Sequence, residues 1–139
     1  RDAQESRGLG DVYKRQHRVL IVEDNDLNME IALEFLQSLG LVCEGAENGL
    51  RAVEMFNASA PGHYEMILMD VRMPVMNGYE ATREIRRLER EDARQIPIVA
   101  MTADAFSSDI KMALNAGMNE HLSKPVSIER LQEVLGQWL

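Results

Sequence analysis

A regular alternation of short apolar runs with amphipathic stretches limits the folds open to this chain. The apolar runs cover residues 19–22, 41–43, 66–69 and 96–101, and a weaker fifth run lies around 121–122. The runs are continuously apolar, which is the pattern of strands that are covered on both faces. Strands of this kind belong to parallel sheets with helices on both sides, so the pattern favours an α/β protein.

Helical periodicity fills the gaps between the apolar runs. Apolar residues recur at helical spacing in five stretches, namely 32–39, 52–56, 81–88, 110–114 and 128–138. Asp26 is a candidate N-cap for the first helix and Gly40 its stop, and Ser127 opens the last helix. In the fourth helix, Ile110 and Leu114 are expected to face the core. Five strands that alternate with five helices predict a parallel sheet with right-handed crossovers.

The charge balance restricts the partners of the protein. The chain has 139 residues and a formal net charge of −8 at pH 7. The sequence shows no basic face of the kind that nucleic acid requires, and an anionic membrane surface would repel such a chain. The run of mixed charges from Arg83 to Arg90 is expected to form a solvated helix face.

The cysteine content and the N-terminal segment bear on compartment and domain boundaries. A single cysteine, Cys43, excludes an internal disulfide, and no secretion signal or membrane span is visible, so a cytoplasmic protein is expected. Residues 1–16 are polar and lack apolar periodicity, which predicts a disordered or non-native leader. Residues 17–139 are expected to form one domain, without a second domain attached.

Polar side chains stand at the carboxyl ends of the predicted strands, where open α/β sheets bind their ligands. Glu23 and Asp24 follow the first apolar run and Asp70 follows the third. Thr102 follows the fourth run and Lys124 the fifth. The fold therefore predicts one pocket that gathers three carboxylates, a hydroxyl and an amine.

The residue types in this pocket indicate phosphoryl chemistry with a metal ion. Three adjacent carboxylates repel one another, and a hard divalent cation with oxygen ligands resolves the conflict. Mg²⁺ fits best, because it takes one or two carboxylates and keeps several waters. With the cation in place, Asp70 can act as a nucleophile that forms an acyl phosphate. Thr102 and Lys124 would then contact the phosphoryl oxygens.

Four sequence motifs around these residues give a resemblance to a known family. VLIVEDN, MILMDVRMPVMNG, PIVAMTADA and HLSKP resemble the ordered signatures of the response-regulator receiver domain of two-component signalling. The resemblance extends from about Val19 to Leu139. It implies a flavodoxin-like, doubly wound, five-stranded parallel sheet with strand order 2-1-3-4-5 and five helices.

The resemblance implies a role for each pocket residue. Asp70 would be the phosphoacceptor, and Mg²⁺ would be bound by Glu23, Asp24, Asp70 and the backbone carbonyl of Arg72. Thr102 and Lys124 would contact the phosphoryl group, and Ala103 would leave room for the phosphodonor. The peptide bond between Lys124 and Pro125 would be cis.

One position departs from the family pattern. The family has a Tyr or Phe three residues before the lysine, and its ring turns inward as the threonine moves; here the residue is His121. Thr102 and His121 would be the switch pair, although burial of the His121 ring would depend on its protonation. Arg72 and Asp104 occupy positions that tune the acyl-phosphate lifetime in this family, and we expect them to pair across the mouth of the pocket.

The resemblance favours a phosphoacceptor switch rather than a turnover enzyme. A histidine kinase or a histidine phosphotransfer domain would be the phosphodonor, and the fourth helix and fifth strand would form the face that changes its partner affinity. The motifs are most like those of C-terminal receivers of hybrid histidine kinases, and a homodimer through the switching face is a further expectation.

Three alternatives stay open on the residues alone. An Mg²⁺-dependent phosphatase or phosphotransferase would also use an aspartyl nucleophile, but its general acid would stand at Arg72, which cannot serve. A flavodoxin-like mononucleotide binder would need a phosphate loop where Glu23 and Asp24 stand. A receiver that only binds partners without phosphorylation is the third. Taken alone, Thr102 could also be a helix cap.

Overall fold

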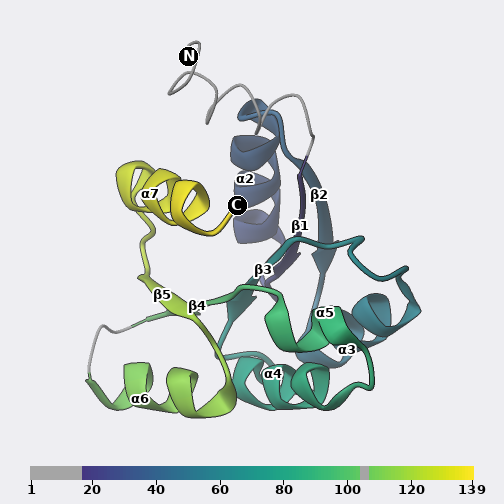
Figure 1. The fold of residues 1–139 in the computed structure, drawn as a ribbon. Coiled ribbons are helices and arrows are strands. Elements are labelled where there is room, and N and C mark those ends of the chain that lie inside the picture. Colours follow the sequence, from purple (N-terminus) through teal and green to yellow (C-terminus); the bar gives the residue numbers. More distant parts are fainter. Residues whose placement is uncertain (1–16, 104–106) are drawn as a thin grey trace.

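The structure, a computed structural model, describes residues 17–103 and 107–139 (Figure 1). The predicted leader at residues 1–16 and Asp104 lie outside this description. No helix within the described residues is long and apolar enough to cross a membrane.

Five parallel strands form one sheet in the order β2-β1-β3-β4-β5. The strands are β1 (Arg18–Val22), β2 (Val42–Ala46), β3 (Met66–Asp70), β4 (Ile98–Thr102) and β5 (Glu120–Ser123). The predicted flavodoxin-like fold and its strand order are therefore confirmed. β2 begins and ends later than the apolar run at 41–43 suggests, because Glu44 and Gly45 pair in register with Leu20 and Ile21 of β1.

Six helices cover the sheet within the described residues, one more than predicted. The helices are α2 (Asp26–Ser38), α3 (Gly49–Ala58), α4 (Gly78–Arg87), α5 (Glu91–Gln95), α6 (Ser107–Ala116) and α7 (Ile128–Trp138). The additional helix is α5, whose five residues are too few to show an apolar period. Figure 1 shows α2 and α7 on one side of the sheet and α3, α4, α5 and α6 on the other.

Neighbouring residues of the central strands belong to two separate cores. In β1, Leu20 and Val22 pack into the core beneath α3 and α4, whereas Val19 and Ile21 pack into the core beneath α2 and α7. The same division holds for β3 and β4. Because side chains alternate across a strand, a strand that is buried on both faces must be apolar at every position. This explains the continuous apolar runs in the sequence.

The helix ends match the predicted signals with one correction. The N-cap of α2 is Asn25 rather than Asp26, and its side chain accepts a hydrogen bond from the Asn28 N–H at 2.9 Å. Asp26 lies in the first turn, where a carboxylate is favoured by the helix dipole. Gly40 has a positive φ of 88°, as expected for the residue that stops the helix. Ser127 caps α7 by accepting from the Arg130 N–H.

The buried face of α6 also differs from the prediction. Leu114 is 57% exposed, and the buried residues are Ala113 and Ala116, with Ile110 half-buried. Small alanine side chains let α6 lie close to the sheet and to α4, so that the larger Leu114 faces outward. The apolar spacing alone did not distinguish these two faces.

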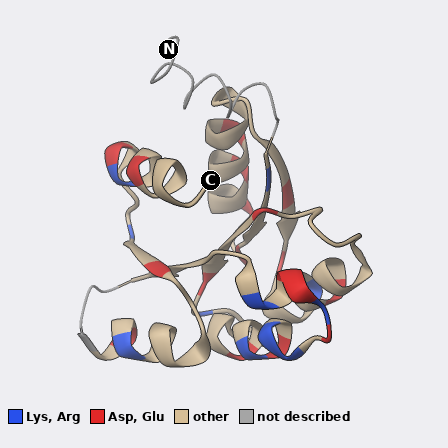
Figure 2. Cartoon of the chain, in the orientation of Figure 1, with Lys and Arg blue, Asp and Glu red and all other residues tan. Residues whose placement is uncertain are grey.

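The charge run from Arg83 to Arg90 is only partly a solvated face, which corrects the prediction. Figure 2 shows basic and acidic residues interleaved on α4. Arg86, however, is half-buried and donates to the carbonyl oxygens of Gly117 and Ala93. Carbonyls of distant segments are partners that a local charge pattern does not reveal.

Arg90 is the second exception in the charge run. It forms two hydrogen bonds with the Asp92 carboxylate, at 2.7 and 2.8 Å, and its guanidinium lies 4.5 Å from the centroid of the Phe56 ring. Arg90 also donates to the Phe56 carbonyl at 2.9 Å. These contacts join the start of α5 to the end of α3.

Candidate functional site

Four of the predicted pocket residues meet at the carboxyl edge of the sheet. The Nζ atom of Lys124 donates to Asp70 Oδ2 at 2.9 Å and to Glu23 Oε1 at 3.2 Å. Carboxylate oxygens of Glu23, Asp24 and Asp70 all lie within 4.8 Å of one another. Asp70 and Glu23 are buried, whereas Asp24 is exposed at the mouth. Carboxylates from the ends of two adjacent strands, β1 and β3, therefore converge with an ammonium from beyond β5.

Backbone turns immediately after the strands hold these carboxylates. The Asn25 N–H donates to Glu23 Oε2 at 3.2 Å, so the residue that caps α2 also orients Glu23. The Arg72 N–H donates to Asp70 Oδ1 at 3.2 Å. Asp70 thus has one oxygen bound by Lys124 and the other by the loop that follows β3.

The loop after β3 returns close to its own strand, and Gly78 makes this approach possible. A Cβ atom at Gly78 would clash with the backbone oxygen of Asp70. Next to it, Asn77 and Glu80 form a capping box, in which each side chain accepts from the backbone N–H of the other residue. The capping box starts α4 at the point where Gly78 touches the end of β3.

Lys124 is positioned by β4 and by the backbone that follows β5. Its N–H donates to the Thr102 carbonyl at 2.7 Å, which extends the pairing of β4 and β5 by one residue. The Lys124–Pro125 peptide bond is cis, as the resemblance implies.

The electrostatics of the pocket are unbalanced. Burial raises the pKa of Glu23, and the charge of Asp70 raises it further, while the Asn25 N–H and Lys124 oppose the shift. Burial by itself lowers the pKa of Lys124, but its hydrogen bond to Asp70 and the charges of Asp70 and Glu23 outweigh burial, so its pKa lies above the usual value. Three carboxyl groups face one ammonium, so the acidic groups outnumber the single basic group.

Thr102 is fully buried, and its hydroxyl has no hydrogen-bond partner within the described part of the chain. A buried hydroxyl without a partner is costly and is therefore rare. Thr102 is the last residue of β4, and α6 begins at Ser107. A hydroxyl at this strand end is free to donate to a ligand.

The other predicted residues lie around the pocket rather than in it. His121 is half-buried on β5, and its Nδ1 atom lies 3.7 Å from Glu120 Oε1. The Arg72 side chain is 71% exposed and pairs with Asp109 on α6, at 3.9 Å between Nη2 and Oδ1. The predicted partner of Arg72 was Asp104, which lies outside the described residues. Ala103 is exposed.

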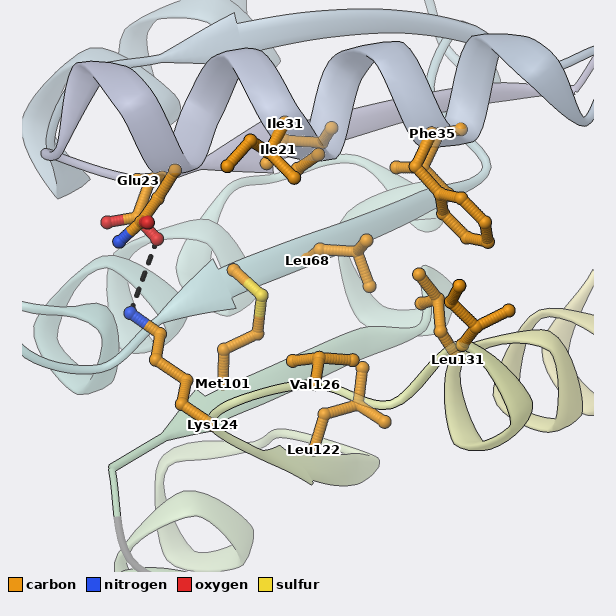
Figure 3. A pocket seen from close by; sticks show the side chains of 14 residues that line it. Ile21, Glu23, Ile31, Phe35, Leu68, Met101, Leu122, Lys124, Val126 and Leu131 are labelled. Carbon is orange, nitrogen blue, oxygen red and sulfur yellow. Dashed lines mark hydrogen bonds and ion pairs between the residues drawn. The ribbon is translucent and has the colours of Figure 1, made fainter.

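An apolar cleft of about 280 Å³ adjoins the pocket, between α2 and α7 (Figure 3). Glu23 and Lys124 form one end of the cleft, and Figure 3 shows the chain of apolar side chains that leads away from them, including Ile31, Leu68 and Leu131. A cation and a phosphoryl group require charged and polar ligands. Their chemistry therefore belongs to the acidic end of the cleft, not to its apolar part.

Comparisons with known proteins agree with the fold and show the family of the chain. The family described as "Response regulator receiver domain" matches residues 19–136, and the chain belongs to this family. The chain is 36% identical to the peroxide stress-activated histidine kinase mak1 of Schizosaccharomyces pombe. That alignment covers 84% of this chain and only 7% of the kinase. This chain therefore spans a small part of the length of that relative.

Two solved structures of receiver domains are close in fold. One is the receiver domain of the sensor histidine kinase PA1611 of Pseudomonas aeruginosa, described with a magnesium ion in its active site cleft. Its TM-score is 0.79 and its sequence identity is 41%, and the match covers 88% of this chain and 96% of that chain. The other is the receiver domain of Ssk1 of Saccharomyces cerevisiae in complex with the histidine phosphotransfer protein Ypd1. Its TM-score is 0.78 and its identity 33%, over 88% of each chain.

Proposed function

We propose that this receiver domain is a phosphoacceptor switch in which Asp70 takes a phosphoryl group from a phosphohistidine. The observation that carries the proposal is the Asp70 carboxylate, held 2.9 Å from the Lys124 ammonium and within 4.8 Å of Glu23 and Asp24. A lone solvated aspartate at a strand end would need neither the half-buried lysine nor the two neighbouring acids.

The transfer is a displacement at phosphorus. A carboxylate oxygen of Asp70 forms the new P–O bond as the P–N bond to the donor histidine breaks, and the electron pair of that bond returns to the imidazole nitrogen. Lys124, which already contacts Asp70 Oδ2, would follow the charge that moves onto the phosphoryl oxygens. The Thr102 hydroxyl, which lacks a partner in the described residues, would donate to the same group.

The acidic cluster fits Mg²⁺ as the cofactor. Glu23, Asp24, Asp70 and the Arg72 carbonyl would hold the ion, and the rest of its shell would be water. When bound, Mg²⁺ offsets the negative charge that would otherwise keep a phosphoryl group away from Asp70. The structure supports the fit through the three converging carboxylates, and the PA1611 domain with its magnesium ion supports the choice of metal.

The phosphodonor in this proposal is a histidine kinase or a histidine phosphotransfer domain. The relationship to histidine kinases and the Ypd1 complex of Ssk1 support it. The domain would act in the cytoplasm, where the ATP that charges a histidine kinase is found. It would not turn over substrates, since the phosphoryl group would be gained and lost on its own aspartate. A homodimer and a switching movement of Thr102 and His121 stay predictions.

A phosphorylation assay tests the proposal. Purified protein is incubated with acetyl phosphate, with and without Mg²⁺, and its intact mass is measured. We expect one alkali-labile phosphoryl group that requires Mg²⁺ and that is absent from Asp70→Asn. Asp26→Asn is the matched control, because it removes an exposed carboxylate near the pocket and should still be phosphorylated.

Two outcomes would overturn the proposal in different ways. No adduct on the wild-type protein would leave a receiver that acts only by binding partners. Continuous release of inorganic phosphate at a rate far above the decay of an isolated adduct would indicate a phosphatase instead.

A further inference from the structure

Arg72 contacts two parts of the molecule at once. Its backbone N–H donates to Asp70 Oδ1, whereas its guanidinium pairs with Asp109 on α6. The Asp109 side chain is only 13% exposed, and it lies in the first turn of α6. The ion pair therefore links the loop that follows the reacting aspartate to the start of α6.

Tyr79 lies near this ion pair. It lies in the first turn of α4, next to Gly78, and it is buried. Burial raises the pKa of the Tyr79 hydroxyl, the Asp109 charge raises it further, and the Arg72 charge lowers it. The charges of both members of the ion pair therefore influence the Tyr79 hydroxyl, at the side of α4 that packs against α6.

Phosphorylation of Asp70 would change the charge that Arg72 faces. A carboxylate carries one negative charge, whereas a phosphoryl group carries about 1.5 to 2 and offers three acceptor oxygens. Guanidinium groups bind phosphate oxygens with two parallel hydrogen bonds, in preference to a single long contact. The Arg72 side chain is 71% exposed and has few packing contacts to break.

We propose that Asp109 is a positioning residue that holds the Arg72 guanidinium away from Asp70 until Asp70 is phosphorylated. The phosphoryl group then competes with Asp109 for Arg72. This inference rests on the proposed function of Asp70. It assigns to α6 a direct electrostatic link to the loop that follows Asp70, in a chain that has His121 where its family has a Tyr or Phe.

The competition has two consequences that are thermodynamically linked. Phosphorylation weakens the contact between Arg72 and Asp109, and the loss of Asp109 strengthens the contact between Arg72 and the phosphoryl group by the same factor. When Arg72 lies over the phosphoryl group, it obstructs the approach of water and slows hydrolysis. Exposed ion pairs are weak, so the expected factor is about two- to fivefold.

A double-mutant experiment on hydrolysis tests the positioning role. We expect the acyl phosphate of Asp109→Asn to decay about two- to fivefold more slowly than that of the wild type. The acyl phosphate of Arg72→Ala should decay faster than that of the wild type. Adding Asp109→Asn to Arg72→Ala should not change this rate further, because Asp109 acts only through Arg72. Asp26→Asn, which also removes an aspartate from a first helical turn, is the matched control and should leave the rate unchanged.

Arg72→Lys provides a second check, since it keeps the charge but loses the two-pronged geometry. We expect the acyl phosphate of Arg72→Lys to decay at a rate between those of the wild type and Arg72→Ala. At about 1 M salt the pair is screened, so the rates of wild type and Asp109→Asn should converge. An effect of Asp109→Asn that persists at full size in the Arg72→Ala background would overturn the proposal.

Amide hydrogen exchange of α6 gives an independent readout. In the wild type, phosphorylation should speed exchange in the first turns of α6. In Asp109→Asn, exchange there should be fast already and should not respond. Intact mass, measured on the same samples, separates the two proposals: a phosphorylated wild type with unchanged α6 exchange contradicts only the role of Asp109, whereas a wild type that takes no phosphoryl group removes both.

Discussion

At the scale of single residues, the position of Asp70 depends on an uncharged neighbour as well as on charged ones. Lys124 is the obvious partner, but Gly78 sets the position of the backbone at the end of β3. The sequence contains no signal for this beyond the glycine itself, because the close approach involves a carbonyl eight residues earlier in the chain. Gly78 is therefore a structural requirement of the pocket.

Two glycine-to-alanine substitutions should change the free energy of unfolding in opposite directions. In Gly78→Ala the new Cβ atom would clash with the Asp70 backbone oxygen, so we expect a loss of about 1–3 kcal/mol in the free energy of unfolding. Gly136 lies exposed in α7 with no atom within 4 Å of its Cβ position, so Gly136→Ala should stabilise by about 0.5–1 kcal/mol. Urea unfolding measures both values. A Gly78→Ala protein of wild-type stability would show that the loop moves freely.

At the scale of helices and strands, an element could be predicted from the sequence where its own residues show a pattern of burial. It could not be predicted where contacts with distant residues hold it in place. The strands were predictable, because burial on both faces requires apolar residues throughout. α5 was not predictable, since it is held by the ion pair of Arg90 with Asp92 and by Ala93 packed in the core. The buried side of α6 was missed for a related reason: small residues face the core there, and the spacing of large residues pointed elsewhere.

The contribution of α5 to stability should depend on pH. The hydrogen bond from Arg90 lowers the pKa of Asp92 below its usual value. The folded state therefore favours the carboxylate, and the added stability is complete above about pH 4 and is lost as the pH falls through the lowered pKa. We expect Asp92→Asn to cost about 1–2 kcal/mol at pH 7 and less near pH 3.

Urea unfolding between pH 7 and pH 3 measures this difference between wild type and variant. Glu91→Gln is the control, since Glu91 is exposed on the same helix and should show little cost at either pH. A cost of Asp92→Asn that is independent of pH would contradict the assignment to the carboxylate.

At the scale of the whole molecule, the candidate site could be predicted because topology places it. Parallel strands bring their carboxyl ends to one edge, so Glu23, Asp24, Asp70 and Lys124 were expected to meet, and their side chains do. Their chemical roles stay predictions until they are measured. The contact of Arg72 with Asp109 could not be predicted, since it depends on how α6 is placed against the loop after β3.

Metal binding should reverse the effect of one substitution on global stability. Without Mg²⁺, Asp24→Asn removes one of three repelling carboxylates and should raise the melting temperature. With Mg²⁺, the wild type should gain about 2.7 kcal/mol when the free ion is at a hundred times its Kd, whereas the variant should gain much less. Thermal unfolding with a chelator and with Mg²⁺ measures both. Equal responses of the two proteins would exclude Asp24 as a ligand.

The central strands are buried on both faces, so the position of Asp70 depends on the correct register of β3. Phosphorylation of Asp70 would therefore test whether the strands are correctly aligned. Asp70 is the last residue of a strand that is buried throughout. A slip of β3 by one residue would move Asp70 by about 3.3 Å and turn its side chain to the opposite face of the sheet, away from Lys124. A misaligned chain could still be compact and rich in helix. The fraction of a preparation that accepts phosphate would therefore measure how much of the protein has reached the native register, which circular dichroism alone would not reveal.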